Sequence, residues 1–320
     1  MVSRRQSRTV TYLINNTMID TVMTDGDESP LIRSLIQRAR KVREKIMISN
    51  NTMSSSSPPS FILDPSKLSY PSSTYNMQID NDDNVLDSQT NKTAAEAAQR
   101  GYCNWLIPNT VMIGRYPGMT PETNGPTSDE CRRHIQNMIE DAKISLFCCL
   151  QTEVPSQDDD DGWTHNEYGV YLTPESLRNE FPNPFTRYGP LAQSFTSEKI
   201  SFLHHPIQDL GVPSSIDTLL SLLSKLIQHL EMEDDHHPKI YLHCWGGIGR
   251  AALTGSCLAS LLYPELSANE ILDWIQQGYN TRAGAKGVHP ALQKSPQTEQ
   301  QRAFVKEFVG GVQTIARRFT

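Results

Sequence analysis

One cysteine in this chain has neighbours that suit nucleophilic chemistry. A short apolar segment, 239–242, leads into His243 and Cys244, and Arg250 follows after a five-residue loop that contains three glycines. A cysteine attacks as the thiolate, and a helix N-terminus or a nearby cation lowers a thiol pKa to about 3.5–7.5. An arginine presents a planar fork that can hold two oxygens of a phosphate. These residues predict attack on a bound phosphate, with Cys244 as nucleophile and Arg250 as phosphate clamp.

The loop between Cys244 and Arg250 is expected to bind phosphate through its backbone. A strand that ends in a tight loop can turn the N–H groups of that loop inward, and a helix beginning near Gly249 directs its positive end at the same point. Glycines allow positive φ angles and close backbone approach, and we expect all three to serve this purpose. The expected phosphate-binding residues are Trp245, Gly246, Gly247, Ile248, Gly249 and Arg250.

The string His243-Cys244-x5-Arg250 resembles the signature of the protein tyrosine phosphatase superfamily. The longer string from Leu242 to Leu253 is most similar to the dual-specificity-type branch, which includes kinase-associated phosphatases of cyclin-dependent kinases. The resemblance implies a phosphatase that forms a phosphocysteine and then hydrolyses it with water, without a metal or cofactor. It also implies that His243 orders the loop by hydrogen bonding rather than acting as a base.

A leaving alkoxide or phenoxide needs a proton, so an acid should lie on a loop that can close over the phosphate. Asp209 lies 35 residues before Cys244, after a predicted strand at 201–207. The family carries its acid on a loop in the same order, and Pro206-Ile207-Gln208-Asp209 resembles the dual-specificity form of that loop. The resemblance therefore implies that Asp209 is the general acid, whereas the residues alone would also fit a simple turn.

The segment Gln297-Thr298-x-x-Gln301 resembles the glutamine loop of classical tyrosine phosphatases. The resemblance implies that Gln297 and Gln301 place the water that hydrolyses the phosphocysteine. The alternative is that both residues form the polar first turn of the last helix.

One position departs from the family pattern. The family usually has serine or threonine directly after the arginine, where the hydroxyl helps the sulfur leave, but this chain has Ala251. Thr254 lies three residues further along the helix and is not expected to replace it. We therefore predict that the phosphocysteine forms but that its hydrolysis is slow. Because of the same departure, the alternative function is that of a weakly active or inactive module that binds phosphorylated residues.

The residues from about 96 to 320 read as one α/β domain, in which a central, mostly parallel sheet is flanked by helices. Expected strands cover 110–114, 144–150, 201–207 and 239–242, and expected helices cover 127–143, 214–232, 249–263, 267–278 and 297–317. Two of the helices begin with capping boxes, formed by Thr127 with Glu130 and by Ser267 with Glu270.

Residues 1–95 are expected to be largely disordered, because the stretches 49–60 and 75–92 are too polar to bury a core. One helix is expected within this region, at 29–48, with apolar residues at helical spacing among six basic ones. It is a candidate docking helix for a partner or an acidic membrane surface. The alternative is a marginal helix with a solvated basic face.

Composition narrows the class of protein further. The 320 residues carry a net charge of −7, which argues against a general nucleic-acid binder. The six cysteines lack the spacing of a disulfide framework or a zinc site, which favours the cytoplasm or nucleus. No apolar run reaches the ~18 residues of a membrane span. The signature loop lacks the basic residues that phosphoinositide phosphatases usually carry there, so the expected substrate is a phosphoprotein, on tyrosine or on tyrosine and serine or threonine.

Overall fold

The computed structural model describes residues 7–14, 17–24, 30–49, 64–70, 74–76, 99–119, 125–153, 185, 187–232 and 238–318. Of the two stretches expected to be unfolded, only Ser49, Tyr75 and Asn76 fall within these ranges. None of the helices in the described ranges is long and apolar enough to cross a membrane.

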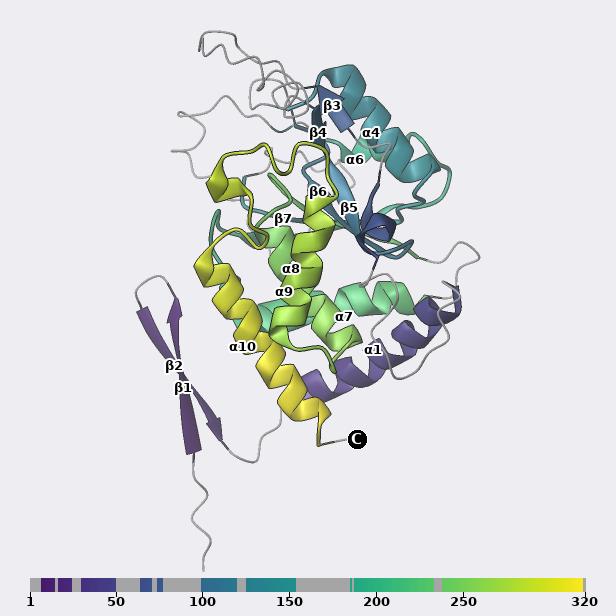
Figure 1. Ribbon diagram of the computed structural model, residues 1–320. Helices are drawn as coiled ribbons and strands as arrows, with labels where there is room; N and C mark the ends of the chain where they lie inside the picture. Colours follow the sequence, from purple (N-terminus) through teal and green to yellow (C-terminus); the bar gives the residue numbers. More distant parts are fainter. Residues whose placement is uncertain are drawn as a thin grey trace, which may run out of the picture.

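A five-stranded sheet forms the centre of the fold (Figure 1). Its strand order is β5(Cys103–Ile107), β6(Val111–Arg115), β9(Ile240–Cys244), β7(Leu146–Gln151) and β8(Ser201–Ile207). The last four strands in this order run parallel to one another, and β5 pairs antiparallel with β6 at one edge. The expected α/β class with a mostly parallel sheet is confirmed.

Two small antiparallel pairs stand outside this sheet. They are β1(Ser7–Ile14) with β2(Thr17–Thr24) and β3(Thr74–Asn76) with β4(Gln99–Gly101). The first pair and β3 lie in the region that we expected to be largely disordered.

The central strands are buried on both faces, which explains their nearly continuous apolar sequence. Successive side chains on a strand point to opposite faces. In β7, Leu146, Cys148 and Leu150 accordingly join one hydrophobic core, and Phe147 and Cys149 join the other. The sheet therefore separates two cores, each of which is closed by helices.

Helices cover both faces of the sheet, as Figure 1 shows. One core is closed by α7(Ile216–Glu231), α8(Arg250–Leu262), α9(Ala268–Asn280) and α10(Glu299–Ala316). The other is closed by α4(Ser128–Glu140) and α6(Gly189–Gln193). Two short 3-10 helices, η1(Pro65–Leu68) and η3(Pro290–Leu292), are also present.

The helix starts follow capping chemistry. The expected capping boxes of Thr127 with Glu130 and of Ser267 with Glu270 are both formed. A third box, of Thr298 with Gln301, begins α10. The N-cap of α7 is Ser215, one residue after the expected start.

The helix expected at 29–48 is present as α1(Pro30–Ser49). Its apolar face is not a docking surface for a partner, because it packs within the same chain against α7, α8 and α10 (Figure 1). Two of its basic residues form ion pairs there, Arg38 with Glu231 at 2.6 Å and Arg43 with Glu265 at 2.7 Å. A segment N-terminal to residue 96 thus contributes to the core of the α/β domain.

The arrangement of the parallel strands decides where functional side chains gather. The carboxyl ends of β6, β9, β7 and β8 lie at the same edge of the sheet, and ligands of open α/β sheets bind at that edge. Cys244 is the last residue of β9, and Asp209 follows two residues after β8.

Candidate active site

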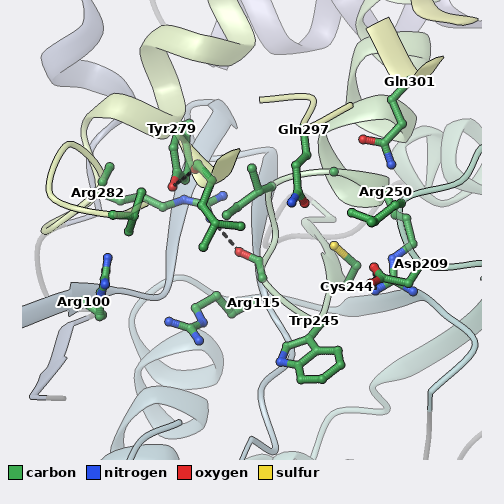
Figure 2. Close-up of a pocket in the computed structure, with 18 of the residues that line it drawn as sticks. Arg100, Arg115, Asp209, Cys244, Trp245, Arg250, Tyr279, Arg282, Gln297 and Gln301 are labelled. Carbon is green, nitrogen blue, oxygen red and sulfur yellow. Dashed lines mark hydrogen bonds and ion pairs between the residues drawn. The ribbon is translucent and has the colours of Figure 1, made fainter. Parts of the chain in front are cut away.

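A cleft of about 400 Å³ opens at the carboxyl ends of the strands. The structure brings the sequence-predicted residues Cys244, Asp209, Arg250, Gln297 and Gln301 together in its wall. Cys244 is only 2% exposed. Figure 2 shows its sulfur directed into the cleft, with Gln297 on one side and Arg250 and Asp209 on the other.

Arg282, which the sequence did not single out, anchors the loop after Cys244. Its guanidinium donates to the carbonyl oxygens of Gly246 at 3.4 Å and Gly247 at 3.1 Å. It also donates to the Ile113 carbonyl at 3.0 Å and to the Asn104 side chain at 2.7 Å. This buried cation therefore fixes the loop to the neighbouring strands β5 and β6.

Three further carbonyls of the loop are bound on its outer side. Those of Trp245, Ile248 and Gly249 accept from the Tyr116 amide at 3.1 Å, the Ser295 hydroxyl at 2.9 Å and the Leu253 amide at 2.9 Å. In a planar trans peptide the N–H points opposite to the C=O. The amides of residues 246, 249 and 250 therefore point away from these partners, an arrangement that suits an anion nest, and all three residues line the cleft.

The three loop glycines serve different purposes, which corrects the expectation that all three permit positive φ. Only Gly247 has a positive φ, of 65°, and a Cβ there would lie 2.2 Å from the backbone of Gly114. A Cβ on Gly249 would lie 2.9 Å from the side chain of Gln301. A Cβ on Gly246 would make only ordinary contacts with Ile248.

Arg250 is buried and held by two carboxylates. Its Nη1 lies 2.7 Å from Oε2 of Glu153, and its Nη2 lies 2.9 Å from Oδ1 of Asp209. Nη1 also donates to the Ile207 carbonyl at 3.1 Å. Burial alone would lower the pKa of Arg250, but the neighbouring charges of Cys244 and of the two carboxylates raise it above its ordinary value. The guanidinium stays charged beside the sulfur.

Asp209 reaches the site from the turn after β8. Leu210 takes the positive φ of this turn, at 58°, and the Gly211 amide donates to the Gln208 carbonyl at 3.0 Å. The Asp209 side chain is 51% exposed, whereas that of its partner Arg250 is 3% exposed. The carboxylate is thus at the mouth of the cleft, where it can move without breaking the core.

Comparison with known proteins finds relatives of this chain. A family profile described as Cyclin-dependent kinase inhibitor 3 (CDKN3) matches residues 186–272. The human protein of that name is 33% identical over 178 residues, which cover 54% of this chain and 67% of the relative. The pig protein is 24% identical over 176 residues, which cover 53% of this chain and 66% of the relative, just under two thirds of its length.

This chain belongs to the protein tyrosine phosphatase superfamily. Among solved structures, kinase-associated phosphatase with its catalytic-site cysteine replaced by serine aligns at 17% identity and a TM-score of 0.39. That alignment covers 63% of this chain and 86% of the other.

The structure also places His243, the residue directly before the proposed nucleophile. His243 is completely buried, and its Nε2 lies 2.6 Å from the Tyr188 hydroxyl. Burial lowers the pKa of His243 well below its usual range. A neutral ring fixed by a tyrosine fits the ordering of the superfamily loop and does not fit a general base that exchanges protons with substrate.

The two glutamines of the predicted glutamine loop differ in their surroundings. Gln301 donates from Nε2 to the Gly211 carbonyl at 2.9 Å and accepts from the Thr298 amide at 3.2 Å. Gln301 therefore links α10 to the turn that carries Asp209. The Gln297 side chain extends into the cleft towards Cys244 in Figure 2, so Gln297 is the better placed of the two to hold a water.

The position that departs from the superfamily pattern lies inside the first turn of α8. Ala251 is fully buried and has no hydroxyl to offer the sulfur. Thr254 is also fully buried, and it is not among the residues that line the cleft.

Glu153 is a second partner in the site that sequence analysis did not select. It lies two residues after the end of β7 and reaches Arg250, 97 positions later in the chain. The only signal was its place after the carboxyl end of a predicted buried strand, where carboxylates of α/β folds often act. No local motif surrounds it.

Proposed function

We propose that this protein is a cysteine-dependent protein phosphatase that hydrolyses phosphotyrosine, with phosphoserine and phosphothreonine as further substrates. The observation that carries the proposal is the position of the Cys244 thiol in the cleft wall, together with the glycine loop that follows it and the charged Arg250 guanidinium. Such a site binds a phosphate and holds a nucleophile in line with it.

In the first step, the Cys244 thiolate attacks phosphorus, the S–P bond forms and the bond to the leaving oxygen breaks. Loop amides and Arg250 stabilise the charge on the three equatorial oxygens. Asp209, in its protonated form, gives its proton to the leaving oxygen. The products are a phosphocysteine and the free hydroxyl of the substrate.

In the second step, water attacks phosphorus, the S–P bond breaks and the thiolate is regenerated. Asp209, now a carboxylate, takes a proton from the water, and Gln297 orients the water from the cleft wall. Ala251 supplies no hydrogen bond to the departing sulfur, so this step is expected to be the slow one.

A phosphoprotein is the substrate class that the loop favours. The five residues between Cys244 and Arg250 include no lysine or arginine. We also propose a reducing compartment, the cytosol or nucleus, which suits six cysteines that are all free thiols.

The second candidate function is a module that binds phosphorylated residues with little or no turnover. Ala251 is the observation that favours it. Both functions need the phosphate nest, but only the phosphatase needs the Cys244 thiolate and an acid at position 209.

Hydrolysis of para-nitrophenyl phosphate separates the two candidates. We expect activity in the native protein and none in the Cys244→Ser variant. We also expect a burst of nitrophenol followed by slow turnover, with the slow phase accelerated in an Ala251→Ser variant. Absence of any activity that depends on Cys244 would favour the binding module, and a steady-state rate unchanged by Ala251→Ser would remove Ala251 as the cause of slow turnover.

A further inference from the structure

Large apolar side chains are exposed inside the cleft. Within the described part of the chain, five large hydrophobic side chains are exposed, and two of them, Leu210 and Leu292, line the cleft that holds Cys244. A single exposed apolar side chain is common on a protein surface, whereas several in one cleft mark a binding surface.

Leu292 belongs to the segment 283–296, which lies between α9 and α10. All four residues by which this segment lines the cleft are apolar, namely Ala283, Ala285, Val288 and Leu292. Its two lysines, Lys286 and Lys294, are not among the lining residues. This part of the cleft wall therefore suits an uncharged side chain of a ligand better than an acidic one.

Hydrogen bonds from side chains hold the backbone of this segment at its two larger apolar positions. The Tyr279 hydroxyl donates to the Leu292 carbonyl at 2.7 Å. The Gln293 side chain donates to the Val288 carbonyl at 2.9 Å, and the Gln293 carbonyl in turn accepts from Gln276 at 2.9 Å. A backbone that is already ordered loses less conformational entropy when a ligand binds against it.

The same segment is tied to the loop that follows Cys244. The Ser295 hydroxyl donates to the Ile248 carbonyl at 2.9 Å, and Leu292 lies three residues before Ser295. Three residues span at most about 10 Å. Gln297, two residues after Ser295, extends into the cleft in Figure 2. The apolar wall is thus a short distance from the place where a phosphate would bind.

The cleft has room for more than a phosphate, since its volume is about 400 Å³. Ligand pockets are lined mainly by apolar side chains, with a few polar groups that fix the orientation of the ligand. A substrate whose phosphate lies at Cys244 has its neighbouring residues in or near this same cleft. The occupant that fits the apolar wall is therefore the substrate itself.

We propose that Val288 and Leu292 form an apolar subsite, which binds an aliphatic side chain of the substrate two or three residues from the phosphorylated one. This inference rests on the proposed phosphatase function and narrows its substrate class to phosphorylated segments that carry such a side chain. An extended peptide advances about 3.4 Å per residue, so two or three residues cover about 7–10 Å. That reach matches the separation of Leu292 from the loop after Cys244.

Binding to the Cys244→Ser variant tests the subsite without turnover. The reference probe is a phosphotyrosine peptide with serine at the positions two and three residues before and after the tyrosine. Four further peptides each carry one leucine at one of these positions, and four carry glutamate instead. We expect one leucine peptide to bind about 10-fold more tightly than the reference, which is the effect of burying most of a leucine side chain. Glutamate at that position should give no such gain.

Variants of the segment then assign the preference to these residues. Leu292→Ser and Val288→Ser, each in the Cys244→Ser background, should reduce the ratio of the leucine and serine peptide affinities towards one. Leu292→Lys should reverse the preference, so that the glutamate peptide binds more tightly than the leucine peptide. Ile48→Ser is the matched control, because Ile48 is an exposed apolar residue of α1 outside the cleft, and it should leave the ratio unchanged. Thermal melting of each variant checks that it is folded.

Three results would overturn the proposal. They are equal affinity for the serine and leucine peptides, a leucine preference that survives Leu292→Ser and Val288→Ser, and self-association of the native protein in sedimentation that Leu292→Ser abolishes. The last result would mean that a second copy of the chain covers the apolar wall. Failure of the phosphatase proposal is distinguishable, because it would appear as lack of hydrolysis that depends on Cys244, whereas the subsite is measured by binding alone.

Discussion

Nη2 of Arg250 lies 2.9 Å from Oδ1 of Asp209, so the phosphate clamp and the proposed general acid are paired with each other. The N–H groups that hold this carboxylate are among those that must hold a substrate phosphate. Asp209 is half exposed and can leave, whereas Glu153 on the inner side keeps Arg250 in place. We therefore expect a phosphate that enters the nest to displace Asp209 from Arg250 and to free it to approach the leaving oxygen.

Asp209→Asn separates the two roles of this carboxylate. Removing its charge should tighten binding of inorganic phosphate or vanadate, because the competing anion is gone. Hydrolysis of phosphotyrosine should slow by about 10²–10⁴-fold, because the acid is gone. The loss should be smaller with para-nitrophenyl phosphate, whose leaving group needs less protonation. An equal loss with both substrates, or weaker vanadate binding, would contradict the assignment.

Glu153→Gln tests the carboxylate that sequence reasoning missed. The variant replaces a buried ion pair to Arg250 with a neutral contact. We expect kcat/KM to fall about 10–100-fold, since charge-assisted hydrogen bonds position the guanidinium. Glu44→Gln, at an exposed position of α1, is the control and should retain native activity. If Glu153→Gln retained the native kcat/KM, the Glu153 carboxylate would not be needed to position Arg250.

A pair of glycine substitutions tests the backbone of the loop. Gly247→Ala places a Cβ 2.2 Å from the Gly114 backbone at a φ of 65°. It should reduce the free energy of unfolding by about 2–4 kcal/mol. In Gly246→Ala the new Cβ meets only the Ile248 side chain, so the free energy of unfolding should change by less than about 1 kcal/mol. Urea denaturation measures both values, and a similar loss in the two variants would contradict this description of the loop.

Four of the buried histidines predict how stability depends on pH. Burial lowers the pKa of His134 to about 3 and of His205 to about 4, and it lowers the pKa of His204 and His243 below their usual range. Below the unfolded pKa of about 6.5 the unfolded chain binds protons that the folded chain does not. Each histidine then lowers stability by up to about 1.4 kcal/mol per pH unit.

The free energy of unfolding should therefore fall by several kcal/mol between pH 6.5 and pH 5. Urea denaturation at three pH values in this interval measures the change. A constant unfolding free energy down to pH 5 would mean that these rings are protonated in the folded protein.

Local sequence predicted the part of the site that one segment supplies. Cys244, the glycine loop and Arg250 form one continuous string between a strand and a helix, and Asp209 follows directly after a strand. Arg282 and Glu153 come from distant segments whose neighbours form no motif, and only the folded sheet brings them to the loop. Their roles depend on long-range packing, which the periodicity of apolar residues and the spacing of motifs do not reveal.

The same limit applies to the fold. Helical spacing predicted α1 and its apolar face, but it could not say that α7 and α8 cover this face. Spacing likewise did not predict β5, which pairs antiparallel with β6 across a short turn and carries Asn104, a partner of Arg282.

Trapping of the covalent intermediate tests the central claim most directly. Native protein is mixed with a radiolabelled phosphotyrosine peptide, quenched within milliseconds and digested, and the labelled fragment is sequenced. We predict that the label is bound to the sulfur of Cys244, approaches one equivalent per protein because Ala251 slows hydrolysis, and is absent from Cys244→Ser. Release of phosphate without label on Cys244, or equal release by Cys244→Ser, would contradict the account.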